Sequence, residues 1–301
     1  MRSALPVPTA VLRDRPDVTV ARVGLGLTVY LDDPERWARE GALVALRSFL
    51  ACAPRDRLGW FTTSAMAAWE PLTDAALGRI IAALPLPWER TRLRHAFELR
   101  LADVPDAPGY GFRYREVDAP RRLGVGWLQL TFPEAHDPDD LAQLAIELAQ
   151  TLPLHAAIGG HLGVWNEVEA HPALAALRPW CRRYLGLDVQ QPDAMGLALH
   201  GALPGTSWLT VLGPALAAAA DLGPPWREPV TVLPLQHGTL VRAGARPALG
   251  DANTFDLPRA YAEVAHRLAA LLPTEPPEFA PWEPGETAAR MRRFIEPEAW
   301  L

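Results

Sequence analysis

One apolar stretch near the start of the chain constrains the fold more than any other feature. Residues 18–31 are rich in valine and leucine, and Gly24 and Gly26 interrupt them two positions apart. A run of this length and composition predicts a buried β-strand. Glycines inside a strand indicate that a neighbouring segment approaches closely. We therefore expect a sheet in which residues 18–31 are buried.

Helices with recognisable starts follow this strand and recur along the chain. Asp32, Asp33, Pro34 and Glu35 predict a helix start, because short acidic side chains cap free backbone amides and proline fits the first turn. Thr73, Asp137 and Asp256 mark further starts, each followed by apolar residues at helical spacing. The predicted helices span residues 32–50, 73–84, 138–152, 172–184, 214–221, 257–272 and 286–294.

Strands are predicted between these helices. Turn residues from Pro105 to Gly109 predict an antiparallel hairpin between two of them. The predicted strands span residues 18–31, 58–63, 95–102, 110–117, 124–132, 155–164, 195–200, 207–212, 230–235 and 239–243. This order indicates the α+β class, with helices packed on a mainly antiparallel or mixed sheet.

The order strand, helix, strand, strand, helix occurs loosely twice. It suggests one α+β domain over residues 19–272 that consists of two packed halves, residues 19–153 and 154–272. Pairing of the two halves in one sheet would support a duplication. Residues 1–18 are punctuated by proline and predict an extended arm. Residues 273–301 predict a proline-rich tail with a short helix that wraps the body.

Composition and charge bear on the class of partner. Hydrophobic residues make up 49% of the chain and charged residues 21%, as in ordinary globular proteins. The formal net charge is -6, and all 29 basic residues are arginine. Proteins that bind nucleic acid usually carry a basic face, so the charge argues against nucleic acid as a partner. It is compatible with a basic protein partner.

Cysteine usage and hydropathy indicate a location. Cys52 and Cys181 lie on apolar faces of predicted helices and are expected to be free thiols in a reducing compartment, with one disulfide as the open alternative. Residues 1–18 lack the apolar core of a signal peptide. The sequence contains no stretch of about 20 apolar residues, which is the length needed to span a membrane. The sequence therefore predicts a cytoplasmic protein that does not enter the membrane.

The side chains that usually carry chemistry do not form a recognisable set. His155 and His161 lie on one predicted strand, separated by roughly 20 Å at about 3.3 Å per residue, too far to share a metal ion. No serine lies in a Gly-x-Ser-x-Gly elbow, and the paired glycines do not precede a helix as a phosphate loop requires. We expect no catalytic residue, metal or cofactor, and leave open a hydrolase that uses His161 or His200.

Several stretches, taken in order, resemble the type VI secretion immunity family. Residues 22–37 read RVGLGLTVYLDDPERW and residues 249–261 read LGDANTFDLPRAY. Asn166 with the helix after it, residues 208–214, residues 242–251 and residues 291–294 are also similar to that family, whereas residues 84–122 have no matching feature. The resemblance implies a protein that occludes a cognate toxin, often a nuclease, in the cytoplasm of the producing cell.

Acidic side chains on loops are the candidates for contact with such a toxin. A nuclease inhibitor has to cover a cationic cleft, and carboxylates can take the place of phosphates there. Solvation or helix capping is the alternative role for each of these side chains. The candidate partner-binding residues are Asp103, Asp106, Glu134, Asp137, Asp139, Asp188, Asp193 and Asp251.

The sequence therefore favours an immunity protein that neutralises a secreted antibacterial toxin by binding it, and that is not an enzyme. Two alternatives stay open. A hydrolase would gather histidines and a carboxylate in one pocket. A structural subunit of a secretion or defence system would form stable oligomers with large apolar interfaces, and a homodimer is compatible with the leading hypothesis as well.

Overall fold

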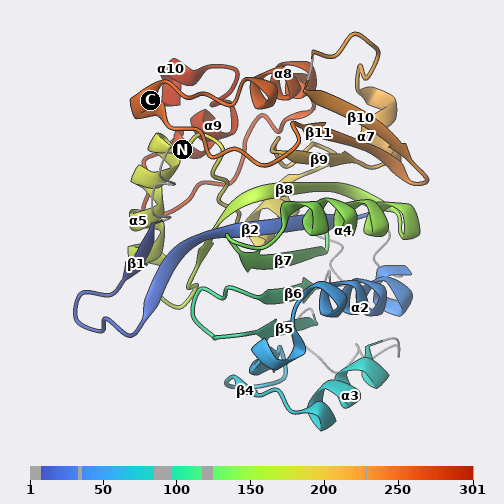
Figure 1. Cartoon of the computed structure of the whole chain (residues 1–301), viewed down its shortest axis with the longest axis vertical. Helices are drawn as coiled ribbons and strands as arrows, with labels where there is room; N and C mark the ends of the chain where they lie inside the picture. Colours follow the sequence, from blue (N-terminus) through green and yellow to red (C-terminus); the bar gives the residue numbers. More distant parts are fainter. Residues whose placement is uncertain (1–7, 33–35, 85–96, 117–124, 228, 301) are drawn as a thin grey trace.

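The computed structural model describes residues 8–32, 36–84, 97–116, 125–227 and 229–300. Within these ranges eleven strands form a single open sheet in the order β10-β11-β9-β8-β2-β7-β6-β5-β3-β4, with β1 paired to β2 (Figure 1). Every pair of neighbouring strands is antiparallel. Helices pack on this sheet, which confirms the predicted α+β class.

The strands are β1 (Thr9–Val11), β2 (Thr19–Leu31), β3 (Trp60–Thr63), β4 (Glu70–Pro71), β5 (Glu98–Ala102), β6 (Gly111–Arg115), β7 (Trp127–Pro133), β8 (Leu154–Trp165), β9 (Leu209–Leu212), β10 (Val230–Leu235) and β11 (Gly238–Ala243). The helices are α2 (Ala42–Cys52), α3 (Asp74–Ala83), α4 (Pro138–Thr151), α5 (Ala170–Arg183), α6 (Pro192–Ala198), α7 (Pro214–Ala219), α8 (Arg259–Leu268), α9 (Glu286–Met291) and α10 (Pro297–Trp300).

Strand β2 lies in the middle of the sheet between β7 and β8, as its apolar sequence predicts. A Cβ atom added at Gly24 would lie 2.6 Å from the carbonyl oxygen of Phe132, and one at Gly26 would overlap the side chain of Leu162. The expected close neighbours are therefore present. Because β8 opens the second predicted half, the two halves join in one sheet through the β2–β8 pair, and their division stays a prediction.

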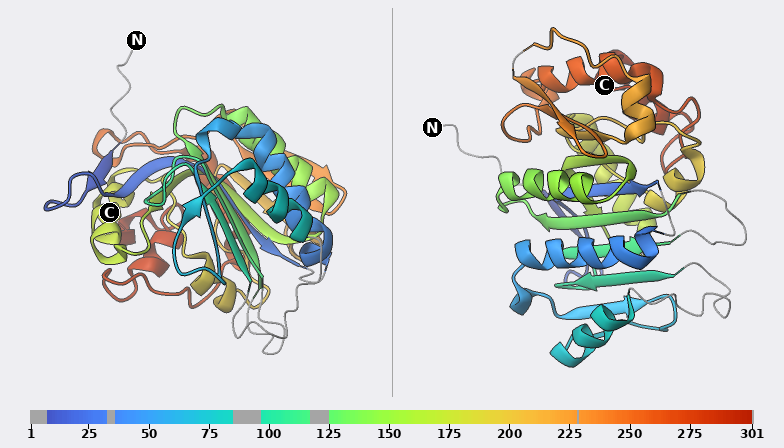
Figure 2. Two further views of the ribbon diagram at one scale, coloured as in Figure 1. Left: turned by 90° about the horizontal axis from the view of Figure 1, so that it is seen from below. Right: turned by 90° about the vertical axis from the view of Figure 1, so that its right-hand side faces the viewer.

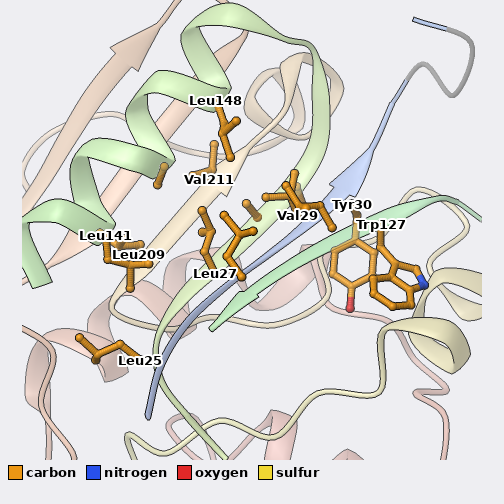
Figure 3. Packing of buried hydrophobic residues seen from close by; sticks show 14 of the residues in the cluster. Leu25, Leu27, Val29, Tyr30, Trp127, Leu141, Leu148, Leu209 and Val211 are labelled. Carbon is orange, nitrogen blue, oxygen red and sulfur yellow. The ribbon is translucent and has the colours of Figure 1, made fainter. Parts of the chain in front are cut away.

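Helices α2 and α4 cover one face of the sheet (Figure 2). The alternation of β2 points Leu25, Leu27 and Val29 toward this layer. Figure 3 shows Leu27 and Val29 of β2 beneath Leu148 of α4, with Val211 of β9 beside them. Burial of such side chains contributes about 1.5–3 kcal/mol each, so this layer is the centre of the hydrophobic core.

The segment after α8 is part of the same core. Phe279, Trp282, Phe294 and Trp300 are all buried in the main hydrophobic cluster. The indole of Trp282 donates to the carbonyl oxygen of Leu174 in α5 at 2.9 Å, and that of Trp300 donates to the carbonyl of Cys181 at 3.2 Å. The end of the described chain is thus fastened to α5 by apolar contacts and hydrogen bonds.

Two predictions about local structure are wrong. Residues 195–200 were expected as a strand, but Pro192 opens helix α6 there, and the helix packs on β7 with the amide of Val125 bonded to the carbonyl of Gly196. Asp256 does not cap the last long helix. Helix α8 follows Pro258 without a side-chain cap, and Asp256 instead pairs through its backbone with Asp251.

Some predicted features lie partly outside the described residues. The acidic start at Asp33, Pro34 and Glu35 is one of them. The described part of that helix begins as a π-helical turn at Trp37–Gly41 and continues as α2. The first residues of the predicted strands at 95–102 and 124–132 are also outside, and so are residues 1–7 of the predicted arm.

Candidate functional site

The face of the sheet away from α2 and α4 is polar over β5, β6 and β7. The register places Glu98 beside Arg115, Arg100 beside Arg113, and Arg113 beside Gln129. Residues at these positions alternate with buried Leu99, Leu101, Phe112, Tyr114, Leu128 and Leu130. Because side chains along a strand point to alternate faces, the charged ones share one surface, which we call the polar face.

Ion pairs connect the polar face to the loop after β8 and to helix α6. Glu98 accepts from the Nε atoms of Arg100 and Arg113 at 2.6 and 2.7 Å. Glu167, just after β8, accepts from Arg100 at 2.9 Å and from Arg113 as well. Asp193 of α6 accepts from Arg113 at 3.3 Å, and lies 2.6 Å from Arg115. Three arginines and three carboxylates thus form one network across strands and loops.

Burial and the neighbouring arginines together determine the ionisation of Glu98 in this network. Burial alone opposes ionisation of Glu98, but the neighbouring charges and hydrogen bonds of Arg113 and Arg100 outweigh it and lower the pKa of the carboxyl group. Arg113 also lies over the ring of Trp127, 4.5 Å from its centroid, and the indole donates to Asp193 at 3.1 Å. Glu98 is therefore ionised at neutral pH, and the network is held by stacking as well as by ion pairs.

A small pocket of about 80 Å³ opens on the polar face. Its lining includes Trp69, Trp165, Gln129 and Thr131 together with the Arg113 and Glu167 pair. Thr131 is 5% exposed, and its hydroxyl has no hydrogen-bond partner. An unpaired buried hydroxyl costs free energy within the fold. The polar groups of the lining that a binding partner could reach are the partly exposed side chains of Arg100, Gln129 and Glu167.

Two of the predicted acidic residues border this face at one end of the sheet. Asp103 closes the β5–β6 turn by accepting from the amides of Val104 and Gly109 at 2.8 and 3.0 Å. Asp106 accepts from the side chain of Asn166 at 2.9 Å and so joins that turn to the loop after β8. Both carboxylates are partly exposed while they order their loops.

Three more predicted acids lie on the β7–α4 connection at the same end. Antiparallel pairing brings the ends of β5 and β7 together, and Tyr110 and His136 meet there with ring centroids 6.3 Å apart. Glu134 is exposed, Asp137 caps α4 through the amide of Asp139 at 3.1 Å, and Asp139 pairs with Arg242 at 2.8 Å. We call the residues 103–109, 133–139 and 166–169 the acidic end.

Apolar side chains are also exposed at the acidic end. Val168 is 88% exposed and Val104 is 39% exposed. Val168 directly follows Glu167, and Val104 lies between Asp103 and Asp106, which binds Asn166. Apolar side chains surrounded by charged groups are typical of the centre and rim of a protein interface.

The remaining three predicted acids are placed differently. Asp193 belongs to the polar face, as described above. Asp188 and Asp251 are only 8% and 7% exposed. Asp188 pairs with Arg290 and Gln190, and Asp251 accepts from Arg183 at 2.9 Å. These two carboxylates are engaged in contacts within the protein, and their contact with a partner stays a prediction.

The histidines considered for a hydrolase do not come together. His161 is buried in β8, whereas His200 is exposed after α6. Burial lowers the pKa of His161 to about 4, its bond to the backbone of Pro247 opposing the shift in part, and its Nδ1 has no partner. Across the described ranges neither imidazole is bonded to a carboxylate, and no cluster of three histidine, cysteine or acidic side chains could hold a metal ion.

Sequence reasoning did not find Glu98, Arg100, Arg113, Arg115 and Glu167. The alternation of charged and apolar residues in β5 and β6 was the available signal. It predicts one polar strand face, but only the tertiary structure shows that both strands turn this face toward Glu167 and Asp193. The cysteines are both free, with Cys181 buried. In the described ranges no helix is long and apolar enough to cross a bilayer.

The chain is similar to one protein family and to a protein of known structure. The profile of the TsiV family, described as type VI immunity for VRR-NUC, matches residues 45–300. The Pseudomonas aeruginosa T6SS protein PA0821 has a similar fold, with a TM-score of 0.74 and 18% sequence identity over 94% of this chain and 88% of that chain. No curated protein matches the sequence. The matched range includes residues 249–261 and omits residues 22–37.

Proposed function

The chain belongs to the TsiV family of type VI immunity proteins for VRR-NUC, and on that premise we propose that it binds a cognate VRR-NUC toxin and blocks the nuclease surface that holds nucleic acid. The observation that carries this proposal is the acidic end, where loop carboxylates and exposed valines gather beside the polar face.

Charge complementarity supports this mode of binding. A nuclease has to hold phosphates, and proteins do so mainly with arginine and lysine. Asp106 and Glu134 offer carboxylates to such a surface, and the net charge of -6 attracts a cationic partner from a distance. The acidic end therefore competes with nucleic acid for the same basic groups.

Apolar contact adds affinity that charge alone does not supply. Val104 and Val168 would be buried against the toxin, while the surrounding acids form the rim. The pocket on the polar face would receive a polar toxin side chain. Inhibition by such coverage needs no chemistry, so the protein acts as a binding protein and not as an enzyme.

The site of action follows from the target. A nuclease toxin does its damage where nucleic acid is, so its inhibitor acts in the cytoplasm. One immunity molecule covering one nuclease is the simplest stoichiometry, and a homodimer would have to leave the acidic end accessible.

A charge-neutralised variant tests the proposal. We expect the wild-type protein to bind its cognate VRR-NUC toxin and to restore growth when the two are co-expressed. The double variant Asp106→Asn with Glu134→Gln keeps the bond to Asn166, and should bind about tenfold more weakly, with slower and less salt-dependent association. Titration calorimetry and surface-based kinetics measure both quantities.

A matched control separates local from general charge effects. The variant Asp221→Asn with Glu275→Gln removes the same charge outside the acidic end, and its affinity should equal that of the wild-type protein. If both double variants lost the same affinity for the toxin, the effect would come from net charge. The acidic end would then not be the interface. Absence of any binding between the wild-type pair would overturn the proposed function itself.

A further inference from the structure

A second exposed feature lies outside the acidic end, in the segment between β11 and α8. Phe255 is 88% exposed, and Leu257 is 40% exposed. We call residues 250–257 the Phe255 loop. It falls within the stretch LGDANTFDLPRAY, whose features the proposed function does not use. An aromatic ring that remains almost fully in water gains nothing from the hydrophobic effect in the isolated protein.

The backbone of Phe255 is strained. Its φ and ψ are 56° and 24°, in the left-handed helical region. Bulky side chains rarely adopt this conformation, because Cβ then approaches the neighbouring carbonyl oxygen. Glycine or asparagine would occupy the position at lower cost. Phenylalanine is therefore unfavourable at this position for two reasons: its backbone is in the left-handed region, and its apolar ring is exposed to water.

Several contacts hold the loop in this shape. The backbones of Asp251 and Asp256 bond to each other in both directions, at 2.8 and 3.1 Å. The buried carboxylate of Asp251 accepts from the amide of Asn253 at 3.0 Å and from Arg183 at 2.9 Å. Gly250, with a φ of 66°, allows the close approach of the Asp256 carbonyl. These hydrogen bonds and the ion pair thus fix the conformation of the loop, which holds the side chain of Phe255 in solvent.

Helix α5 relates this loop to the acidic end. The helix begins right after the 166–169 loop and ends at Arg183, which binds Asp251 (Figure 1). Fourteen residues at about 1.5 Å each make the helix roughly 21 Å long. A standard interface covers about 800 Å² of each partner, or about 30 Å across. One partner can therefore contact both features at once.

We propose that Phe255 is an aromatic anchor that enters an apolar pocket of the toxin, presented by a rigid loop at a second point of contact beyond the acidic end. Asp251 and Arg183 act as positioning residues for this anchor. The inference rests on the proposed function. Rigid, exposed aromatic side chains are typical binding hot spots, because little conformational entropy is lost when they are buried.

The toxin is a better occupant than a second copy of the chain. Phe255 and Leu257 are two side chains on one protruding loop, and so small an apolar area does not reach the size of a stable dimer interface. As an anchor within a larger contact that includes the acidic end, the same two side chains suffice.

Substitutions of Phe255 test the anchor. Phe255→Asn relieves the backbone strain and removes the ring, so the melting temperature should rise by a few degrees while affinity for the toxin falls at least tenfold. Phe255→Trp keeps an aromatic ring and should bind within about threefold of the wild-type protein. Leu233→Ala removes an exposed leucine from β10, 43% exposed, and should change neither quantity. Calorimetry and thermal unfolding give the two readouts.

The outcomes separate this inference from the proposed function. Binding of Phe255→Asn as tight as that of the wild-type protein would overturn the anchor while leaving the acidic end in place. A wild-type dimer that Phe255→Asn converts to a monomer, measured by light scattering, would assign the ring to self-association instead. No binding by the wild-type protein would overturn both proposals.

Discussion

Single polar side chains in this protein serve the fold first, and this changes how the candidate site is interpreted. Thr73 caps α3 through the amide of Ala76 at 3.1 Å, and Asp137 caps α4. Asp103 closes a turn. Such bonds contribute about 1 kcal/mol each. Reduced toxin binding by an alanine variant of these residues would therefore combine two effects, lower stability and the loss of a contact with the toxin. Asparagine variants, which retain the bonds, separate the two effects.

His161 gives a prediction at the scale of one residue. Burial lowers its pKa to about 4 in the folded protein, against about 6.5 for an unperturbed histidine. The unfolded chain therefore binds a proton that the folded protein does not, and stability falls as the pH drops from about 6.5 toward 4. We expect the wild-type protein to lose about 2 kcal/mol more than His161→Gln between pH 7 and pH 5.

Urea unfolding of both proteins at several pH values measures this difference. Other titrating groups, including His136, whose pKa burial also lowers, are present in both proteins and cancel. A difference in unfolding free energy that stays constant with pH would show that His161 titrates normally in the folded state.

At the scale of elements, the β2–β8 pair decides the architecture. Eleven pairs of residues match along these two strands. In addition, β2 pairs with β7 and β1, and β8 pairs with β9. Glycines in both strands allow the backbones and side chains to approach closely. The second predicted half therefore meets the first at its most apolar strand, and not through a separate interface of surface side chains.

Two glycines of β2 should differ in their tolerance of alanine. The new methyl group at Gly24 meets the carbonyl oxygen of Phe132, a backbone atom that is fixed by the sheet. At Gly26 the nearest atom belongs to the end of the Leu162 side chain, which can rotate. We expect Gly24→Ala to cost about 1–3 kcal/mol of unfolding free energy and Gly26→Ala to cost less. Equal losses in chemical denaturation would contradict this reasoning.

At the scale of the whole molecule, buried charges lock the last segment to the body. Asp188 pairs with Arg290, and Arg293 lies nearby with its pKa lowered to about 10, because burial and the charge of Arg290 outweigh the attraction of Asp188. Arg293 also donates to the carbonyl of Leu185 at 2.6 Å. The segment after α8 is thus held by ionic and apolar contacts together.

Removal of the central carboxylate should release this segment. Asp188→Ala leaves two buried guanidinium groups without their anion, and breaking a buried pair in this way costs about 3–5 kcal/mol. We expect lower stability in urea and faster proteolytic cleavage within residues 273–285. Glu296→Gln breaks the exposed pair with Arg292 and should cost less than about 1 kcal/mol. Equal cleavage rates for Asp188→Ala and Glu296→Gln would show that the buried ion pairs of Asp188 do not hold this segment.

The sequence by itself determined the elements whose signals are local: the buried strand at residues 18–31, the caps at Thr73 and Asp137, and the antiparallel strand pair joined by the turn at residues 105–109. Each depends on residues within a few positions of one another. The short apolar run at residues 195–200 was misassigned because its pattern fits a strand or a buried helix, and packing on β7 decided between them.

Only the tertiary structure decided which acids are exposed and which are engaged inside the protein. Asp188, Asp193 and Asp251 look alike in the sequence, as short polar residues on loops. Folding pairs Asp188 with arginines a hundred residues away, places Asp193 on the polar face, and turns Asp251 inward to hold Phe255 outward. Burial and ion pairing depend on what distant segments bring to the same point, and no local pattern records that.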